Sequence, residues 1–306
     1  MSRLAWTDVP LEVRREVERL LGGPVVSAQS QAAGLSPGSA DRVRLADGTR
    51  AFVKAVAAAA NPDSVGIHRQ EIRVLGALPP GLPLAGLIGG VDTGDWVAVV
   101  LEDVDGRQPT WTDAEVRLVL SALAPLTDLS TPLLPLPPLT DYAADEFSGW
   151  ESVRAVDLPY DQDMNTWVAT HLGRLAALAA EGVTRCAGGA VVHHDLRADN
   201  VLLREADGQA VLIDWPWAAL GSEWFDPVCL VLDARRRRGC DIDQVLATHP
   251  AFDKMPSGTA ECFLSGLAGF FTYQATLPPA VGIPGLRGFQ RDQGRVALEW
   301  LRGRVG

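Results

Sequence analysis

The stretch HHDLRADNVLLREADGQAVLIDW, residues 193–215, carries the most specific pattern in this chain. It opens with a loop of the form H-x-D-L-x-x-x-N, and two short apolar runs follow the loop. Asp207-Gly208, between the two runs, is a strong turn signal for a β-hairpin. Residues 201–204 and 210–213 should therefore pair as antiparallel strands.

This hairpin is expected to bring three oxygen-bearing side chains together. Asn200 and Asp214 are symmetric about position 207, so they should face each other about 5 Å apart at its open end. Asp195 lies five residues before Asn200, on the loop that enters the same end. One amide and two carboxylates suit a hard cation that prefers oxygen ligands. Phosphoryl transfer uses such a set: an Asp receives a hydroxyl proton, and an Asn and an Asp hold Mg²⁺ on the phosphates.

We therefore expect Asp195 to act as the catalytic base, and Asn200 and Asp214 to bind Mg²⁺. The alternative is a loop whose Asp caps a helix, but the full spacing and the apolar strand before Asp214 favour phosphotransfer. His193 is expected to brace the loop backbone. His194 is expected to line a pocket or to be a packing residue.

The composition indicates a globular protein with room for one large domain or two lobes. The chain has 306 residues, of which 47% are hydrophobic and 21% are charged. Its formal charge of −11 argues against a nucleic-acid partner, because phosphate backbones are bound by basic surfaces. The same charge would suit a cationic small substrate. Four cysteines without C-x-x-C or metal-site spacing indicate reduced thiols.

The chain shows no pattern for export or for a membrane partner. Its N-terminus lacks the apolar core of a signal peptide, and no stretch approaches the roughly 20 apolar residues of a membrane span. A cytoplasmic location is therefore expected. The basic run at residues 235–238 is interpreted as a solvated helix or loop face, with a partner-binding surface as the alternative.

Lys54 is one of only two lysines among 27 basic residues, in a chain that otherwise uses arginine. It lies in RAFVKAV, a β-patterned run that follows the turn residues Asp47-Gly48. A compact ammonium fits between phosphate oxygens in a way that a planar guanidinium does not. We expect Lys54 to contact nucleotide phosphates from an early strand. An exposed lysine on an edge strand is the alternative.

A carboxylate partner for Lys54 is expected on the next helix. Apolar residues at helical spacing predict a helix over residues 65–78, and Glu71 is the only acid within it. We expect Glu71 to form an ion pair with Lys54 and to orient it. The competing interpretation is a Glu71 that faces solvent.

A small-residue turn precedes the lysine strand. Gly34, Ser36 and Gly38 lie at this turn, where backbone amides could approach phosphate oxygens. Taken alone, this signal is weak, since other hairpin tips have similar sequences. No Walker A motif is present in the sequence, which favours the lysine-on-strand design over a P-loop.

The β pattern ends at LEDVDG, after strands predicted over residues 87–92 and 96–102. We interpret this point as a hinge. It would divide a nucleotide-binding lobe, residues 1–104, from a catalytic and substrate-binding lobe, residues 105–306. Backbone groups of Glu102 and Val104 in the hinge are placed to pair with a purine edge.

Helix signals occur on both sides of this hinge. A helix over residues 9–21, with Asp8 as its N-cap, is expected to open the chain. Thr112 and Glu115 form a capping box that should start a helix running to about residue 126. An amphipathic helix over residues 166–182 should lead towards the loop that carries Asp195.

Together these motifs resemble those of the aminoglycoside phosphotransferase and choline kinase family, bacterial relatives of protein kinases that modify small molecules. The resemblance covers most of the chain, through SPG, FVK, LEDVDG, HHDLRADN, LIDW, Gly221 and Asp226-Pro227. It implies a bilobal, protein-kinase-like α+β fold, with a small β-rich N-lobe and a larger, mainly helical C-lobe. It also implies ATP or GTP with Mg²⁺. The family's base, phosphate lysine, paired glutamate and metal ligands fall on Asp195, Lys54, Glu71, Asn200 and Asp214.

Two departures from the family and kinase patterns bear on the substrate. The family usually has glycine at the position of His194, so this imidazole is expected to crowd or line the acceptor pocket. Asp214 is followed by Trp-Pro rather than by the Phe-Gly of protein kinases, and no Ala-Pro-Glu anchor follows. The Trp-Pro after Asp214 and the lack of an Ala-Pro-Glu anchor both favour a small-molecule kinase over a protein kinase.

The expected activity is transfer of the γ-phosphate of ATP or GTP to a hydroxyl of a small molecule. The acceptor would be an antibiotic, such as an aminoglycoside or a macrolide, or a metabolite such as choline, homoserine or a sugar. A pseudokinase that binds its ligands without turnover is the alternative from another class.

Overall fold

The computed structural model describes residues 4–31, 38–127, 129, 135–153, 157–237, 240–280, 283 and 285–305. These residues form two compact units. The first comprises the described residues within Met1–Pro109, Asp199–Trp217 and Val281–Ile283. The second comprises those within Thr110–Ala198, Ala218–Ala280 and Pro284–Gly306.

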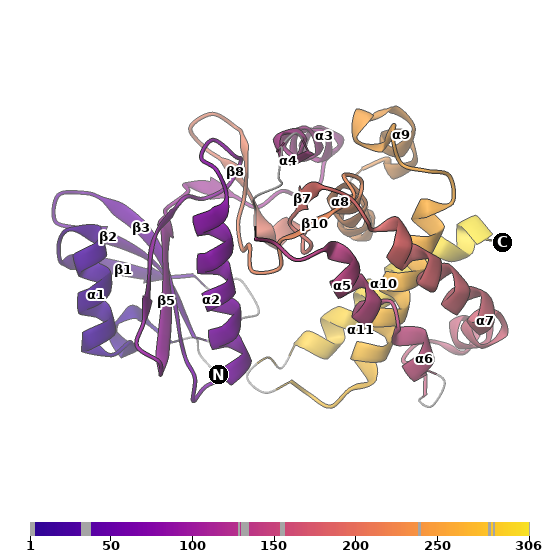
Figure 1. Ribbon diagram of the computed structural model, residues 1–306, viewed down its shortest axis with the longest axis horizontal. Helices are drawn as coiled ribbons and strands as arrows, with labels where there is room; N and C mark the ends of the chain where they lie inside the picture. Colours follow the sequence, from indigo (N-terminus) through magenta and orange to yellow (C-terminus); the bar gives the residue numbers. More distant parts are fainter. Residues whose placement is uncertain are drawn as a thin grey trace. The chain divides into compact units, whose positions relative to one another are not determined.

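The first unit is built on a five-stranded antiparallel sheet with the strand order β1-β2-β3-β5-β4. Helices α1 (Leu11–Leu21) and α2 (Pro62–Ala77) pack against its strands (Figure 1). The two strands expected over residues 87–92 and 96–102 are confirmed with these bounds. The five strands are β1 (Val25–Ser30), β2 (Ser39–Leu45), β3 (Arg50–Ala57), β4 (Leu87–Asp92) and β5 (Trp96–Glu102).

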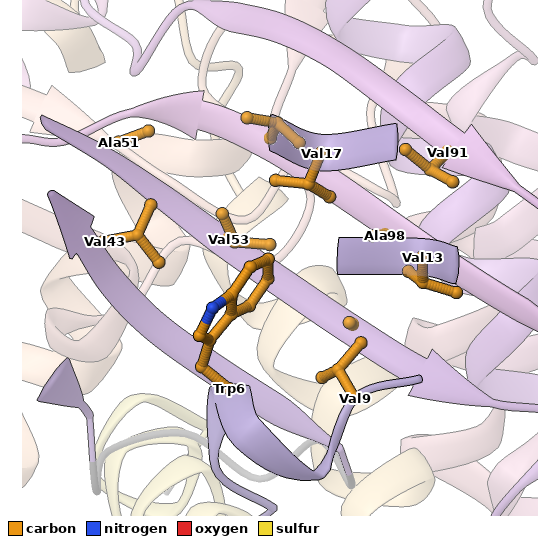
Figure 2. Close-up of a cluster of buried hydrophobic side chains, with 11 residues drawn as sticks. Trp6, Val9, Val13, Val17, Val43, Ala51, Val53, Val91 and Ala98 are labelled. Carbon is orange, nitrogen blue, oxygen red and sulfur yellow. The ribbon is translucent and has the colours of Figure 1, made fainter. Parts of the chain in front are cut away.

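Alternation along β3 separates the core of this unit from its site. Successive side chains of a strand point to opposite faces. Val53 and its alternate neighbours face α1 and pack in an apolar cluster with Trp6, Val13 and Val17 (Figure 2). Val56 packs instead with Val65 at the start of α2. Lys54 therefore lies on the face of the sheet that α2 covers.

The first helix begins later than the sequence indicates, and Asp8 is not its N-cap. Helix α1 starts at Leu11, and Pro10 precedes it with an extended backbone. Asp8 instead ends a short 3₁₀ turn, η1 (Trp6–Asp8), where its carboxylate accepts the N–H of Ala5 at 2.9 Å. The reason lies in Pro10, because a residue before proline is held in extended conformations and cannot continue a helix.

Helix α2 begins earlier than expected. Asn61 caps it by accepting the N–H of Ser64 at 3.1 Å, and Pro62 occupies the first helical position. The helix therefore includes three residues ahead of the predicted start at residue 65. Glu71 remains in its middle, nearly three turns from the cap.

The expected hairpin is present, but its register differs by one residue from the prediction. Strands β8 (Val201–Arg204) and β9 (Ala210–Leu212) pair with Val201 opposite Leu212. The ladder therefore runs symmetrically about the 206/207 bond rather than about residue 207, so Asn200 does not oppose Asp214.

The turn chemistry explains this shift. The amide of Gly208 donates to the carbonyl of Arg204 at 2.8 Å, and the amide of Arg204 donates to Gln209 at 2.9 Å. Gly208 has φ +70, which glycine adopts without strain. Asp207-Gly208 thus closes a four-residue loop instead of forming a two-residue turn. A short strand, β6 (Gly106–Arg107), pairs with β8 on the other side.

The second unit is mainly helical and contains one small antiparallel ladder, β7 (Ala190–Val192) with β10 (Ala219–Gly221). The capping box of Thr112 and Glu115 is confirmed, although the helix it starts is broken at Leu123. The predicted helix over residues 166–182 is present and longer. The described α-helices of the second unit are α3 (Asp113–Ala122), α4 (Ala124–Thr127), α5 (Leu139–Glu146), α6 (Gly149–Val153), α7 (Gln162–Arg185), α8 (Phe225–Arg237), α9 (Ile242–Thr248), α10 (Thr259–Thr276) and α11 (Leu286–Val305).

Helix α10 packs against α6, α7 and α11. Glycine permits the close approach of α6, since a Cβ on Gly149 would lie 2.4 Å from the backbone of Gly269. The buried indole of Trp150 donates to the carbonyl of Ser265 at 2.8 Å and fixes the same contact. Across the described ranges, no helix combines the length and apolar character needed to cross a bilayer.

Candidate active site

In the first unit, the ammonium of Lys54 lies between two carboxylates. Its Nζ is 2.7 Å from Oε1 of Glu71 on α2 and 3.0 Å from Oδ1 of Asp214, which follows β9. The ion pair expected between Lys54 and Glu71 is therefore present. Glu71 is 1% exposed, so the alternative of a solvent-facing carboxylate is wrong.

The pKa values of Lys54 and Glu71 depend on burial and on the charges beside them. Burial lowers the pKa of Lys54, but the charges of Asp214 and Glu71 raise it more, so the amine is held protonated. Burial raises the pKa of Glu71, and the Lys54 ammonium opposes that rise. Glu71 also accepts the backbone N–H of Trp215 at 3.4 Å. The cluster thus links β3, α2 and the segment after β9.

The open end of the hairpin brings Asn200 close to the residue before Asp214. The carbonyl of Asn200 accepts the N–H of Ile213 at 3.0 Å. Asp214 then leaves the strand with φ +69, a conformation that aspartate tolerates better than most residues. Strand β9 ends at Leu212, one residue before the predicted end at residue 213. Asp214 reaches Lys54 from the turn that follows the strand.

The donor types at this end suit Mg²⁺. Asn200 supplies an amide oxygen and Asp214 a carboxylate whose side chain is 40% exposed. Mg²⁺ commonly binds through one or two protein oxygens and retains several waters. Within the described ranges no group of three His, Cys, Asp or Glu side chains forms an all-protein metal cage.

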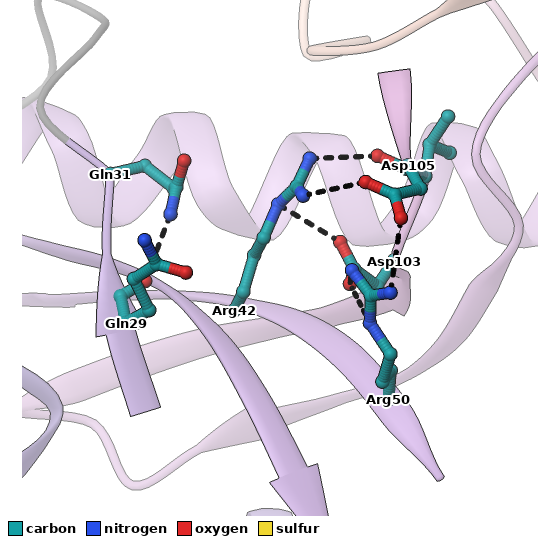
Figure 3. A network of polar contacts seen from close by, with 7 residues as sticks. Gln29, Gln31, Arg42, Arg50, Asp103 and Asp105 are labelled. Carbon is teal, nitrogen blue, oxygen red and sulfur yellow. Dashed lines mark hydrogen bonds and ion pairs between the residues drawn. The ribbon is translucent and has the colours of Figure 1, made fainter. Parts of the chain in front are cut away.

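The hinge segment is held by a network of two arginines and two aspartates (Figure 3). Arg42 of β2 lies 3.2 Å from Asp103 and 3.3 Å from Asp105. Arg50 of β3 lies 2.7 Å from Asp103 and 3.2 Å from Asp105. Hydrogen bonding to Arg50 lowers the pKa of Asp105 below its usual range.

Two of the hinge groups considered for a purine already have protein partners. The N–H of Glu102 donates to the carbonyl of Gly86 at 2.9 Å. The carbonyl of Val104 accepts from Arg42 at 2.8 Å. The N–H of Glu102 is therefore occupied, whereas the carbonyl of Val104 keeps a second lone pair. Purine binding at the hinge stays a prediction.

Of the small-residue turn, Gly34 and Ser36 lie outside the described residues. Gly38 has φ +109, and a Cβ there would lie 2.4 Å from the carbonyl oxygen of Ala55. Only glycine fits this position at the start of β2. Gly38 therefore packs closely against β3 at Ala55, the residue after Lys54. Its expected contact with phosphate stays a prediction.

In the second unit, a carboxylate of α8 holds the loop that carries Asp195. Asp226 accepts the N–H of His193 at 2.6 Å and that of His194 at 3.0 Å. Nδ1 of His193 accepts the N–H of Asp195 at 3.3 Å. His193 therefore braces the backbone, as its sequence position predicted. Asp226 is 4% exposed and lies more than 30 residues away in the chain.

Asp195 contacts a cation within the same loop. Its Oδ1 lies 2.6 Å from Nη1 of Arg197, and the Arg197 guanidinium lies over the ring of Phe289 at 4.9 Å from the centroid. The side chain of Asp195 is 32% exposed, so a small molecule can reach it. Arg197 thereby places a positive charge beside the carboxylate proposed as base.

His194 has a buried side chain and a left-handed backbone with φ +71. Nε2 lies 3.2 Å from Glu146 of α5, and the ring stacks on Tyr142 at 5.0 Å. Burial lowers the pKa of His194, but its hydrogen bond to Glu146 and the charges of Glu146, Asp226 and Asp195 raise it more. The net shift favours the imidazolium.

Some acidic residues between positions 141 and 163, and some tryptophans, have structural roles in the second unit. Asp161 caps α7 by accepting the N–H of Met164 at 2.9 Å, and Asp163 pairs with Arg302. Trp150 and Trp224 are buried. Of that set, Glu146 is the carboxylate that reaches the loop of Asp195. The basic run is explained in part by Arg235, which lies over Trp300, and by Arg236, which pairs with Asp233.

No sequence motif predicts a role for Asp226, Asp233, Trp111 or Arg197. Asp226 and Asp233 did carry a signal, since they are the acids of FDPVCLVLDA, an otherwise apolar helical run. A carboxylate buried in such a helix requires hydrogen-bonding partners. What those partners are could not be read from the run itself.

The sequence matches the model of the phosphotransferase enzyme family over residues 33–257. The chain belongs to this family. A search of curated proteins gave no match.

Solved structures share the fold over most of the chain. Choline kinase LicA from Streptococcus pneumoniae is 15% identical, with a TM-score of 0.58 over 94% of this chain and 98% of that one. Macrolide 2′-phosphotransferase type I is also 15% identical, with a TM-score of 0.54 over 100% and 99%. Amicoumacin kinase hAmiN, in complex with AMP-PNP, Ca²⁺ and Ami, is 12% identical, with a TM-score of 0.51 over 88% of each chain. The expected α+β, protein-kinase-like fold is confirmed.

Proposed function

We propose that this family member transfers the γ-phosphoryl group of ATP or GTP to a hydroxyl of a small molecule. The observation that carries the proposal is the Lys54 ammonium held between Glu71 and Asp214. An amine fixed in this way is suited to bind phosphate oxygens, and Asp214 is available beside it for Mg²⁺. The amicoumacin kinase complex with AMP-PNP supports a nucleotide as co-substrate.

The nucleotide would be bound by residues of the first unit. Lys54, oriented by Glu71, would contact the phosphates, and the turn of Gly34, Ser36 and Gly38 would offer backbone amides to them. The carbonyl of Glu102 and the N–H of Val104 would pair with the purine. Asn200 and Asp214 would hold Mg²⁺, which when bound neutralises charge on the phosphates.

The acceptor hydroxyl would be oriented and deprotonated by Asp195 in the second unit. Arg197, 2.6 Å from Asp195, would help to hold the carboxylate in place. Phosphoryl transfer demands little covalent chemistry from the protein, so most of the rate would come from positioning and charge stabilisation. The reaction would take place in the cytoplasm, where ATP and Mg²⁺ are abundant.

The acceptor class is proposed more coarsely, as a small molecule that carries a hydroxyl. Glu146 lies close to the Asp195 loop and would favour an acceptor with an amino group. The names of the solved relatives include choline and macrolide acceptors, so both metabolites and antibiotics belong in the first screen.

The direct test is Mg²⁺-dependent nucleotide consumption with amino sugars, macrolides, amino-alcohols, homoserine and sugars. Asp195→Ala should lower turnover by about 10²–10⁴-fold, the usual contribution of a general base, and should leave nucleotide affinity nearly unchanged. Asp243→Asn, which alters an exposed aspartate of α9, is the matched control. Unchanged phosphorylation by Asp195→Ala would sink the assignment.

Two other outcomes would replace this proposal. Nucleotide binding without turnover on any acceptor would indicate a binding module related to pseudokinases. Phosphate incorporation into a generic polypeptide, but not into small molecules, would indicate a protein kinase.

A further inference from the structure

Helix α8 contacts the loop of Asp195 at both ends. Asp226 and Asp233 are seven residues apart on this helix, which places them on one face two turns from each other. Asp226 accepts the N–H groups at the start of the loop. Oδ2 of Asp233 accepts the N–H of Ala198, at the end of the loop, at 2.9 Å. Asp195 lies between these two anchors.

Asp233 is itself held by a buried tryptophan. Its Oδ2 also accepts the indole N–H of Trp111 at 2.8 Å, and its Oδ1 lies 3.1 Å from Nη2 of Arg236. Asp233 is 2% exposed and Trp111 is fully buried. A carboxylate with several N–H donors around it is fixed in direction, and losing its charge would leave those donors without an adequate acceptor.

The backbone of Trp111 adopts a strained conformation in the structure that makes this contact. Its φ of +64 is rare for a bulky residue and persists only where the surroundings hold it. Glu115 provides that enforcement, because its carboxylate accepts the N–H of Thr110 and that of Thr112, each at 3.0 Å. The segment on both sides of Trp111 is therefore clamped while the indole reaches Asp233.

We propose that Asp233 is a positioning residue for the reaction. Through Ala198 it fixes the far end of the loop that carries Asp195, and Trp111 keeps the Asp233 carboxylate aimed at that amide. The proposal rests on the function proposed above for Asp195. With both ends held, the loop cannot swing about its Asp226 anchor. This matters because a displacement of about 1 Å in a reacting group can lower the rate by about 10²-fold.

Asp233→Asn tests this role with a side chain of nearly the same shape. The amide carries no charge, and its NH₂ group must face either Arg236 or the donors Ala198 and Trp111, so the anchor at Ala198 weakens. We expect kcat to fall by about 10–100-fold while KM for nucleotide and acceptor changes by less than about 3-fold. Trp111→Phe removes the indole N–H and leaves a small cavity while keeping the Asp233 carboxylate, and it should lower kcat less. Asp243→Asn, on the exposed face of α9, is the control for loss of one carboxylate.

Hydrogen exchange supplies a readout that does not depend on turnover. Amides of residues 193–198 should exchange at least about 10-fold faster in Asp233→Asn than in the parent protein, while a peptide from α2 in the first unit should be unchanged. If Asp233→Asn fails to fold, Trp111→Phe carries the same measurement. Parental kcat together with parental exchange in the loop would overturn the proposal.

The same experiment separates this inference from the proposed function. If the parent protein transfers no phosphate but the loop of Asp233→Asn exchanges faster, the anchoring role stands and the proposed function fails. If the parent protein is inactive and exchange is also unchanged, both fail.

Discussion

At the residue scale, Lys54 lies in a site where every group depends on its partners. Its side chain is 15% exposed and that of Glu71 is 2% exposed. Charges so poorly solvated are tolerated only in pairs, and removal of one partner from a buried pair is strongly destabilising. The position thus couples the stability of the first unit to its expected binding of phosphate.

Lys54→Met should lower the free energy of unfolding by about 3 kcal/mol, because Glu71 is left buried without its cation. Adding Glu71→Met should recover part of the loss, so the double variant should cost less than the sum of the single ones. Urea unfolding of all four proteins measures this. Additive costs would show that the two residues are not coupled.

His194 carries a pH dependence whose sign follows from its raised pKa. The ordinary pKa is 6.5, and a higher value in the folded protein means that folding favours the imidazolium. The stabilisation is then complete below pH 6.5 and disappears as pH rises through the folded-state pKa. Removing Glu146, the hydrogen-bond partner, should therefore matter most in acid.

Glu146→Gln should lower the melting temperature more at pH 6 than at pH 9, relative to the parent protein at each pH. Thermal melts in buffers of equal ionic strength measure the difference, with Asp243→Asn as a control that should show no such trend. A deficit that grows with rising pH would contradict the assigned protonation of His194.

At the element scale, the β8–β9 hairpin depends on its four-residue turn. Gly208 adopts φ +70, and nothing lies within 4 Å of the position where a Cβ would be added. The cost of a side chain there is consequently conformational and not steric. Because Asn200 and Asp214 flank the two strands, the turn sets the geometry of both proposed metal ligands.

Gly208→Ala should lower the free energy of unfolding by about 1 kcal/mol, and Gly208→Asn by less, because asparagine tolerates the left-handed region. Gly173→Ala is the matched comparison. Gly173 lies exposed within α7 with open space around it, so alanine should stabilise the protein by about 0.5–1 kcal/mol. Thermal or urea unfolding that ranks the two alanine variants in the reverse order would contradict this account of the turn.

At the scale of the whole molecule, nucleotide binding and catalysis are assigned to residues of different units. Lys54, Glu71, Asn200 and Asp214 belong to the first unit, and Asp195 belongs to the second. Substitutions should therefore separate the two functions. The net charge of −11 opposes the binding of an anionic nucleotide, and Mg²⁺ weakens this repulsion because it lowers the charge of the nucleotide.

Mg²⁺ with ATP at about 100 times its Kd should stabilise the protein by about 2.7 kcal/mol, seen as a rise in melting temperature. Asp195→Ala should keep this rise, whereas Asp214→Asn should lose most of it. The nucleotide without Mg²⁺ and Mg²⁺ alone are the controls. An undiminished shift in Asp214→Asn would remove Asp214 from the metal site.

Local sequence predicted the elements best where turn residues mark their ends. Strands β4 and β5 have the predicted bounds, and turn residues follow each of them. Element ends were less predictable. Pro10 delayed the start of α1, Asn61 advanced that of α2, and the turn before Gly208 moved the hairpin register by one residue. Each of these depends on one local feature: a proline, a capping side chain or a glycine in a turn.

The sequence by itself determined which chemistry is available. The spacing of Asp195, Asn200 and Asp214, with Lys54 and Glu71 upstream, indicated phosphoryl transfer before any contact was known. Only the tertiary structure decided how these groups are held. Asp226 and Asp233 reach the loop from a helix more than 30 residues later, and Trp111 reaches Asp233 across 122 residues. Hydrogen bonds over such separations depend on how elements pack, and no local periodicity encodes that packing.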